Sequence, residues 1–272
     1  MFKVIKRSEL APTEVEMIIE APRIATKALA GQFVILRIDE FGERIPLTIV
    51  DTNSEKGSIR LIFQVIGKST AQLARIRAGE NIKDLVGPLG KATEIDNYGN
   101  VLLVGGGVGI AALFPIIKAM KKAGNHVTTI LGAKTAELVL LAKECQTYSD
   151  ELIIMTDDGS LGTAGIVTDA MEKIFQQQNI VKAWAIGPSK MMKYCTLTAQ
   201  KYQVPIYVSL NPIMIDGTGM CGGCRVTIAD TIKFACVDGP EFLGNEVNWD
   251  EFSKRMKQYQ KEEVSAFKRY QK

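Results

Sequence analysis

Four potential metal ligands lie close together in the last quarter of the chain. Cys221 and Cys224 are separated by two glycines, Cys236 follows Cys224 by twelve positions, and Asp216 precedes Cys221 by five. Counting backwards, Asp216 falls on the first position of a plant-type Cys-x4-Cys-x2-Cys…Cys iron–sulfur spacing. The pattern therefore predicts a 2Fe–2S cluster held by Asp216, Cys221, Cys224 and Cys236. A structural zinc site with the same four ligands is the alternative.

A cluster of glycines joins the apolar run Val101–Val104 to a predicted helix. Glycines let a backbone approach a pyrophosphate closely, and the free N–H groups at the start of a helix attract its charge. A tight strand–helix turn with no ligand is the alternative interpretation. The residues predicted to bind a nucleotide at this turn are Gly105, Gly106, Gly107, Val108 and Gly109.

Two further loops follow the third and fourth predicted strands of the same region. Ligands bind at the carboxyl ends of strands in open α/β sheets, so we expect both loops to contribute to the site. The paired aspartates would repel a 2′-phosphate and could accept hydrogen bonds from a ribose, which favours NAD over NADP, whereas Lys134 favours the opposite choice. A solvated loop that caps the next helix is the alternative for the aspartates. The candidate residues are Asp157, Asp158, Gly159, Ser160, Gly187 and Pro188.

Three short stretches in the first hundred residues lie at the ends or edges of predicted strands. An arginine with a following threonine can hold a phosphate and the polar edge of a ring, and a Gly-Pro-x-Gly turn presents backbone donors. Taken singly, each stretch is explained better by a turn without a ligand, so the case depends on their order ahead of a nucleotide-binding region. The candidates are Arg44, Pro46, Leu47, Thr48, Gly67, Ser69, Thr70, Gly87, Pro88, Leu89 and Gly90.

The elements that must position these residues change character along the chain. Short segments rich in β-branched residues, bounded by glycine and proline, predict a small antiparallel barrel. From residue 100 onward, strands alternate with helices, including a helix over 136–145, which predicts a parallel sheet with helices on both faces. The predicted fold class is β + α/β: an antiparallel β-barrel over 1–97, a doubly wound parallel-sheet nucleotide-binding domain over 98–210, a small iron–sulfur lobe over 211–246 and a helical tail over 247–272.

Composition excludes several classes of protein. The chain has 272 residues, of which 46% are hydrophobic and 23% charged, as in ordinary soluble globular proteins. Its net charge of +3 is too small to favour nucleic acid as a partner. Glycines and Pro115 interrupt the longest uncharged stretch, and the N-terminus lacks the apolar core of a signal peptide. We therefore expect a cytoplasmic protein without a membrane span.

The single histidine, His126, also limits the chemistry. One histidine argues against a Ser-His-Asp hydrolase, a His-ligated metalloenzyme and a Rieske-type centre. Hydride and electron transfer need no side-chain acid or base, because the cofactors carry that chemistry. The scarcity of histidine therefore agrees with the three sets of motifs above, and no catalytic side chain is predicted.

The order of barrel, nucleotide domain and cysteine loop resembles the ferredoxin–NADP reductase superfamily over nearly the whole chain. Within it, the sequence is similar to the electron-transfer subunits of dihydroorotate dehydrogenase and to the small (alpha) subunits of NADH-dependent reduced ferredoxin:NADP oxidoreductase, also called sulfide dehydrogenase beta subunits. The resemblance implies that the stretches 44–48, 67–70 and 87–90 bind FAD. It also implies that the stretches 105–109, 157–160 and 187–188 receive a pyridine nucleotide.

Two positions depart from the family pattern. The family's glycine turn usually continues with Ala-Pro, whereas Ala111 is followed here by Ala112. Subunits of the dihydroorotate type carry a cysteine where this chain has Asp216. An aspartate there matches the bifurcating transhydrogenase-type small subunit.

The resemblance also implies a partner. It predicts an electron-transfer flavoprotein subunit with FAD, a 2Fe–2S cluster and NAD(H), joined to a larger flavin and iron–sulfur subunit in a heterodimer. NADP and ferredoxin would react through that partner in flavin-based electron bifurcation. The alternatives are a dihydroorotate dehydrogenase electron-transfer subunit and a zinc-stapled, nucleotide-sensing interaction module. We expect the basic tail either to dock on the partner or to pack on its own barrel.

Overall fold

The computed structural model describes residues 1–271, which separate into two compact units. The barrel unit contains Met1–Lys91, Asn211–Gly239 and the chain from Asn248 onward, and the sheet unit contains Ala92–Leu210 and Pro240–Val247. The cysteine-containing segment and the tail therefore share a unit with the barrel. The division of the chain into four functional segments stays a prediction.

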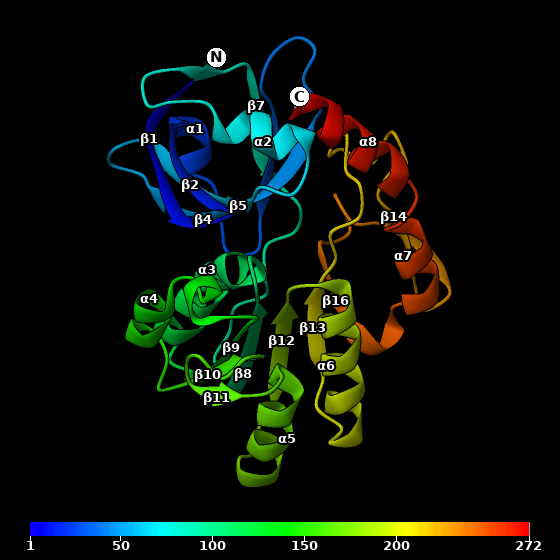
Figure 1. Ribbon diagram of the computed structural model, residues 1–272. Coiled ribbons are helices and arrows are strands. Elements are labelled where there is room, and N and C mark those ends of the chain that lie inside the picture. Colours follow the sequence, from blue (N-terminus) through cyan, green and yellow to red (C-terminus); the bar gives the residue numbers. More distant parts are fainter. Residues whose placement is uncertain (272) are drawn as a thin grey trace. The chain divides into compact units, whose positions relative to one another are not determined.

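The barrel unit is built on a seven-stranded antiparallel sheet, as predicted, in the order β6-β1-β2-β5-β4-β3-β7 (Figure 1). The outermost strands β6 and β7 are separated in the sequence by Lys83 alone, so the sheet curls until its two edges nearly meet. Buried side chains that include Met17, Leu36 and Leu61 fill the interior. The elements are β1 (Phe2–Ala11), β2 (Glu14–Glu20), β3 (Phe33–Arg37), β4 (Ile45–Asn53), β5 (Ser58–Gln64), β6 (Asn81–Ile82) and β7 (Asp84–Leu89), with the short helices α1 (Pro22–Ala25) and α2 (Lys68–Ala74).

The sheet unit contains the predicted alternation of strands and helices. Five main strands pair in parallel in the order β10-β9-β8-β12-β13, the two-residue strand β11 extends one edge, and β16 pairs antiparallel with β13 at the other. The strands are β8 (Asn100–Gly106), β9 (His126–Ala133), β10 (Glu151–Thr156), β11 (Thr163–Ala164), β12 (Lys182–Ile186), β13 (Ile206–Ser209) and β16 (Glu241–Leu243). The longer helices are α3 (Gly109–Lys122), α5 (Val167–Gln177) and α6 (Ser189–Lys201).

Helices cover both faces of this sheet, as predicted. A side chain added at Gly105 would meet Ile110 and Leu113 of α3, whereas one added at the next residue, Gly106, would meet Met191 of α6. Successive strand residues point to opposite faces, so α3 lies on one face and α6 on the other. Gly132 lies beside Gly106 in the sheet and faces Val167 of α5, which places α5 on the same face as α6.

The prediction of a single helix over 136–145 is wrong. The chain instead forms a short 3-10 helix, η1 (Ala136–Leu138), and a separate helix, α4 (Ala142–Thr147). Leu141 stands between them with a φ of 53°, a left-handed conformation that breaks the helical hydrogen-bond ladder. Periodicity alone did not reveal this break, because the residues around it are all compatible with a helix.

The C-terminal part of the barrel unit holds a hairpin and the tail. Strands β14 (Arg225–Ile228) and β15 (Thr231–Phe234) form the hairpin. The tail contains the helices α7 (Trp249–Arg255) and α8 (Gln260–Tyr270), which follow the 3-10 helix η2 (Gly244–Glu246) of the sheet unit. Helix α7 contacts β14 and α8 contacts α2. The guanidinium of Arg75 lies 4.5 Å from the centre of the Tyr270 ring. The tail thus packs on its own unit.

None of the helices among residues 1–271 combines the length and the apolar character that crossing a bilayer requires.

A desolvated carboxylate fixes β16 at the edge of the sheet unit. Thr93 donates a hydrogen bond to Glu241 Oε1 at 2.5 Å, and the indole N–H of Trp184 donates to Oε2 at 3.2 Å. Burial raises the pKa of Glu241 to about 7, although these two donors and the nearby Lys182 charge act in the opposite direction. The neighbouring Lys182 ammonium lies over the rings of Tyr98 and Tyr207.

This environment makes the stability of the sheet unit depend on pH. Because the folded-state pKa of Glu241 exceeds its unfolded value of 4.5, the folded protein binds the proton more tightly. The resulting stabilisation is complete below pH 4.5 and is lost as the pH rises towards 7, by about 3 kcal/mol in total. Glu241→Gln mimics the protonated acid, so we expect it to remove this dependence and to stabilise the unit at pH 8.

Urea unfolding followed by Trp184 fluorescence, in a Trp249→Phe background, measures the effect. The Glu241-containing protein should lose stability between pH 5 and pH 7.5 while the glutamine variant loses less. Equal slopes for the two proteins over that range would contradict the assignment.

Candidate functional site

The predicted nucleotide turn lies where the strand order of the sheet unit reverses. Strand β8 is central, with β9 and β10 on one side and β12 and β13 on the other. Residues 105–109 leave β8 and residues 187–188 leave the adjacent β12, and Ile186 pairs directly with Gly105. The structure therefore brings these two predicted stretches together at the carboxyl ends of neighbouring strands. Such a topological switch point is where open α/β sheets bind ligands.

Gly109 sets how closely α3 approaches β12. A Cβ at this position would lie 2.4 Å from the backbone oxygen of Ile186 and 2.7 Å from Gly187 Cα, so only a residue without a side chain fits. The helix also has no acidic residue in its first turn. The first turn is therefore held against the 187–188 loop with a local charge that suits an anion.

The predicted aspartate loop follows β10 and is held to the loop after β9. Backbone N–H groups of Asp157 and Asp158 donate to the carbonyls of Ala133 and Lys134, and Ala136 N donates to Ser160 Oγ at 2.8 Å. Ser160 also donates to Asp158 Oδ1 through its hydroxyl and its N–H, which lowers the pKa of that carboxyl. The loop is thus shaped internally by Asp158, and Asp157 is exposed beside it.

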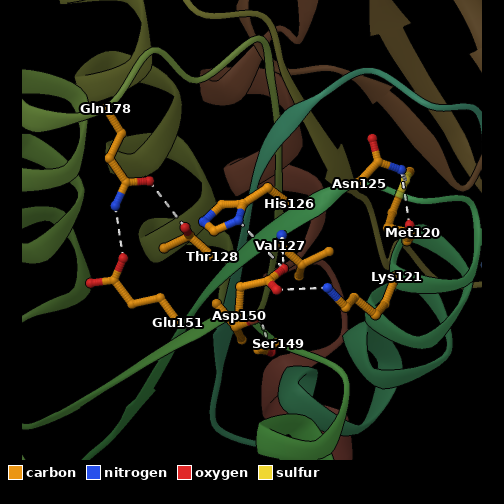
Figure 2. Close-up of polar contacts among 11 residues, drawn as sticks. Met120, Lys121, Asn125, His126, Val127, Thr128, Ser149, Asp150, Glu151 and Gln178 are labelled. Atoms are coloured by element: carbon orange, nitrogen blue, oxygen red, sulfur yellow. Dashed lines mark hydrogen bonds and ion pairs between the residues drawn. The ribbon is translucent and has the colours of Figure 1, made fainter.

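The histidine lies at the other end of the sheet from these loops. His126 begins β9, and its Nδ1 is 3.7 Å from Asp150 Oδ2 (Figure 2). The same carboxylate accepts from the backbone N–H of Val127 and forms an ion pair with Lys121, 2.6 Å from its Nζ. These contacts join α3, β9 and the start of β10, so the structure assigns His126 no place near the predicted nucleotide turn.

In the barrel unit, two of the predicted stretches flank β3. Phe33 pairs with Thr48 of β4 on one side and with Leu89 of β7 on the other. The carbonyl of Gly90 accepts a hydrogen bond from the Gln32 side chain at 2.8 Å. The stretches 44–48 and 87–90 therefore lie largely on the two strands that pair with β3, one on each side of it.

The third predicted stretch, 67–70, is joined to the 44–48 stretch by Glu43, a residue that the sequence analysis did not identify. The hydroxyl of Ser69, which is buried at the start of α2, donates to the carboxylate of Glu43, directly before Arg44. The hydroxyl of Thr70 accepts from the backbone N–H groups of Ile66 and Gly67 and closes the turn. No sequence signal marked Glu43, because its role depends on a contact between segments that are distant in the chain.

The predicted metal ligands are partly gathered. The thiols of Cys224 and Cys236 are buried, and their sulfurs lie 3.2 Å apart without forming a disulfide. Asp216 Oδ2 accepts from the backbone N–H of Cys221 at 2.8 Å, and Oδ1 accepts from Thr218 N at 2.9 Å. The Thr218 hydrogen bond, followed by the one from Cys221, lowers the pKa of the Asp216 carboxyl. Within residues 1–271, however, no three such side chains converge closely enough to form a preassembled metal site.

The loop around these ligands has the donor chemistry that an iron–sulfur group needs. The backbone N–H of Gly223 points at Cys221 Sγ at 3.4 Å, and Cys236 N points at Cys224 Sγ at 3.5 Å. Such hydrogen bonds to sulfur tune iron–sulfur centres. Burial, together with the adjacent Cys224, raises the pKa of the Cys236 thiol to about 12. The donor set fits a cluster, although the role of each ligand remains a prediction.

Sequence comparisons identify close relatives. Residues 211–248 match the family model described as the iron–sulfur cluster binding domain of dihydroorotate dehydrogenase B. The chain is 53% identical over 268 residues to a dihydroorotate dehydrogenase B (NAD(+)) electron transfer subunit homolog of Thermotoga maritima, with 98% of this chain and 95% of the relative covered. It is 32% identical to the dihydroorotate dehydrogenase B (NAD(+)) electron transfer subunit of Desulforamulus reducens, with 91% and 97% covered.

Structural comparisons agree. A chain from the NADH-dependent reduced ferredoxin-NADP oxidoreductase structure, solved for insight into flavin-based electron bifurcation, matches with a TM-score of 0.95 and 51% identity, covering 100% of this chain and 98% of that one. The ferredoxin reductase of carbazole 1,9a-dioxygenase shares the fold at a TM-score of 0.64 and 15% identity, covering 76% of this chain and 67% of that one. The predicted resemblance and fold class are confirmed.

The close approach at Gly109 can be tested by adding one methyl group. Gly109→Ala places a Cβ against backbone atoms that cannot rotate away, so α3 must shift from β12. We expect a loss of about 1–3 kcal/mol in the stability of the sheet unit, as for other overpacked positions. Ala112→Ser, in the same helical turn, should cost only about 0.5 kcal/mol through helix propensity. Urea unfolding of both variants measures the difference, and equal losses would contradict the proposed contact.

Proposed function

The chain belongs to the family of dihydroorotate dehydrogenase B electron-transfer subunits and their homologues, and from this premise we propose that it is the electron-transfer subunit of an NADH-dependent reduced ferredoxin:NADP oxidoreductase. The observation that carries the proposal is the match to that enzyme's structure over the full length of this chain at 51% identity. Asp216 supports it, because the bifurcating enzyme's small subunit is the family member expected to carry aspartate at this position.

Three groups would supply the redox chemistry. When bound, NAD(H) and FAD exchange a hydride, and a 2Fe–2S cluster carries single electrons, so no side chain need act as acid or base. Arg44, Ser69 and the 87–90 turn would hold the flavin. The 105–109 turn, the 157–160 loop and the 187–188 loop would hold the nicotinamide nucleotide, with Asp157 favouring NAD(H) over its 2′-phosphorylated form.

The cluster would be held by Asp216, Cys221, Cys224 and Cys236. Both oxygens of Asp216 already accept backbone N–H groups, which orient the carboxylate and leave further lone pairs for a metal. Cys224 and Cys236 offer two sulfurs on one side of the site. Backbone donors at Cys221 and Cys224 would stabilise thiolate charge.

The larger partner is part of the proposal. A chain that only relays electrons needs a second polypeptide to accept or supply them, and we infer a flavin and iron–sulfur subunit through which NADP and ferredoxin react. Co-purification from the native cell, with identification of the second polypeptide, tests this step.

A dihydroorotate dehydrogenase electron-transfer role is the second candidate. The family model matched at residues 211–248 and the names of the relatives favour it. The local chemistry would be the same in both cases, so the identity of the co-purifying subunit decides between them. The zinc-stapled interaction module would instead yield a colourless protein that contains zinc and no iron.

Substitution of Asp216 tests the cluster assignment. Asp216→Asn removes the charge with little change in shape, and we expect at least about a tenfold loss in iron retention after anaerobic reconstitution. Asp230→Asn in the β14–β15 hairpin is the matched control and should retain wild-type iron content. Asp216→Cys should keep a cluster with an altered reduction potential.

Iron analysis, the visible spectrum and an EPR-monitored redox titration provide the measurements. Wild-type protein should also bind flavin and be reduced faster by NADH than by NADPH. Undiminished iron in Asp216→Asn, or an unaltered potential in Asp216→Cys, would show that Asp216 is not a ligand.

A further inference from the structure

A cavity of about 270 Å³ lies between the cysteine loop and the tail of the barrel unit. Cys221 and Gly223 line it from the loop, and Arg255 and Tyr259 line it from the tail. The cavity therefore brings the end of α7 beside a predicted cluster ligand that is distant in the sequence. Neither the family match nor the predicted ligand set assigns a role to this part of the tail.

Arg255 is connected to the Cys221 sulfur by two successive hydrogen bonds. Its Nη2 donates to the carbonyl of Gly223 at 2.9 Å, and the N–H of the same glycine points at Cys221 Sγ at 3.4 Å. Gly223 lies between Cys221 and Cys224, so the guanidinium holds the segment that joins two predicted ligands. Movement of Arg255 would change the direction of an N–H donor at sulfur.

The guanidinium of Arg255 is only partly satisfied by hydrogen bonds. Its Nε is buried and has no hydrogen-bond partner among residues 1–271, and no acidic side chain lines the cavity. Leaving a buried donor unsatisfied costs about 1–3 kcal/mol. An apolar side chain of similar length would fill the same space without that cost, but it would lose the hydrogen bond to the Gly223 carbonyl. Packing alone therefore does not explain an arginine at this position.

We propose that Arg255 is a positioning residue of the cluster site, which holds the Gly223 N–H towards Cys221 and supplies positive charge beside the predicted ligands. The inference rests on the proposed function, since it takes Cys221 as a cluster ligand. A positive charge at this position favours the more negative, reduced state of the site and so raises its reduction potential. The clamp on Gly223 also slows release of iron, as outer-shell hydrogen bonds do at other metal sites.

Two neighbouring substitutions separate this role from a general effect of charge. Arg255→Met and Lys254→Met each remove one positive charge from the end of α7, but Lys254 is exposed and does not line the cavity. Arg255→Lys retains the charge while losing the planar guanidinium. All three proteins are reconstituted anaerobically, and thermal unfolding checks that the tail remains folded.

The readouts are the midpoint potential of the cluster, from an EPR-monitored titration, and the rate of iron release to a chelator. We expect Arg255→Met to shift the potential downward and to release iron about tenfold faster or more. Lys254→Met should match the wild type in both measurements. Arg255→Lys should keep most of the wild-type potential and release iron at an intermediate rate.

The outcomes distinguish this inference from the proposed function. A wild-type protein that binds no iron would overturn both. A wild-type protein with a normal cluster, combined with identical potentials and release rates for Arg255→Met and Lys254→Met, would overturn the role of Arg255 alone. An Arg255→Lys protein that matches Arg255→Met in both midpoint potential and iron-release rate would overturn the proposed role of the positive charge.

Discussion

The pairing of β13 with β16 is the constraint on which the cysteine site depends. Ser209 pairs with Glu241, and Leu210 N donates to the carbonyl of Pro240 at 2.9 Å, so residues 211–239 leave and return at one place in the sheet unit. Strand β16 has only three residues, and the desolvated Glu241 carboxylate adds two side-chain hydrogen bonds to hold it. Both ends of the cysteine-containing segment are therefore fixed before any metal binds.

Close packing fixes the middle of that segment as well. A Cβ on Gly217, next to Asp216, would lie 2.6 Å from Leu89 and 2.8 Å from Ile35, so the cysteine loop lies directly on β3 and β7. Strand β7 contains most of the predicted flavin stretch 87–90, and β3 pairs with β4, which contains most of the stretch 44–48. A predicted flavin site and a predicted cluster site therefore belong to one compact unit. Electron transfer benefits from such an arrangement, because the separation between the sites does not depend on motion of the chain.

Sequence patterns predicted most of the sheet unit, because its strands are continuous apolar runs and its ligand loops follow directly from them. Strand β1 was not predicted: it carries three basic residues, and Val4 alone among its residues is fully buried. Alternation of elements predicted that residues 105–109 and 187–188 follow strands at the same edge of a parallel sheet, but the pairing of β8 with β12, which brings them together, was not predicted. Glu43, Glu241 and Arg255 could not be found in this way, because each acts through a contact with a segment distant in the chain and none lies in a motif.

The two ends of the 211–239 segment lie side by side, because the strands before and after it, β13 and β16, pair with each other. A segment whose ends are adjacent can be inserted into a loop, or deleted from it, without disturbing the framework on either side. Without the segment, β13 and β16 would still pair and would be joined by a short connection. The region with the metal ligands is thus arranged as a cassette, which a simpler two-part reductase could acquire in one genetic step.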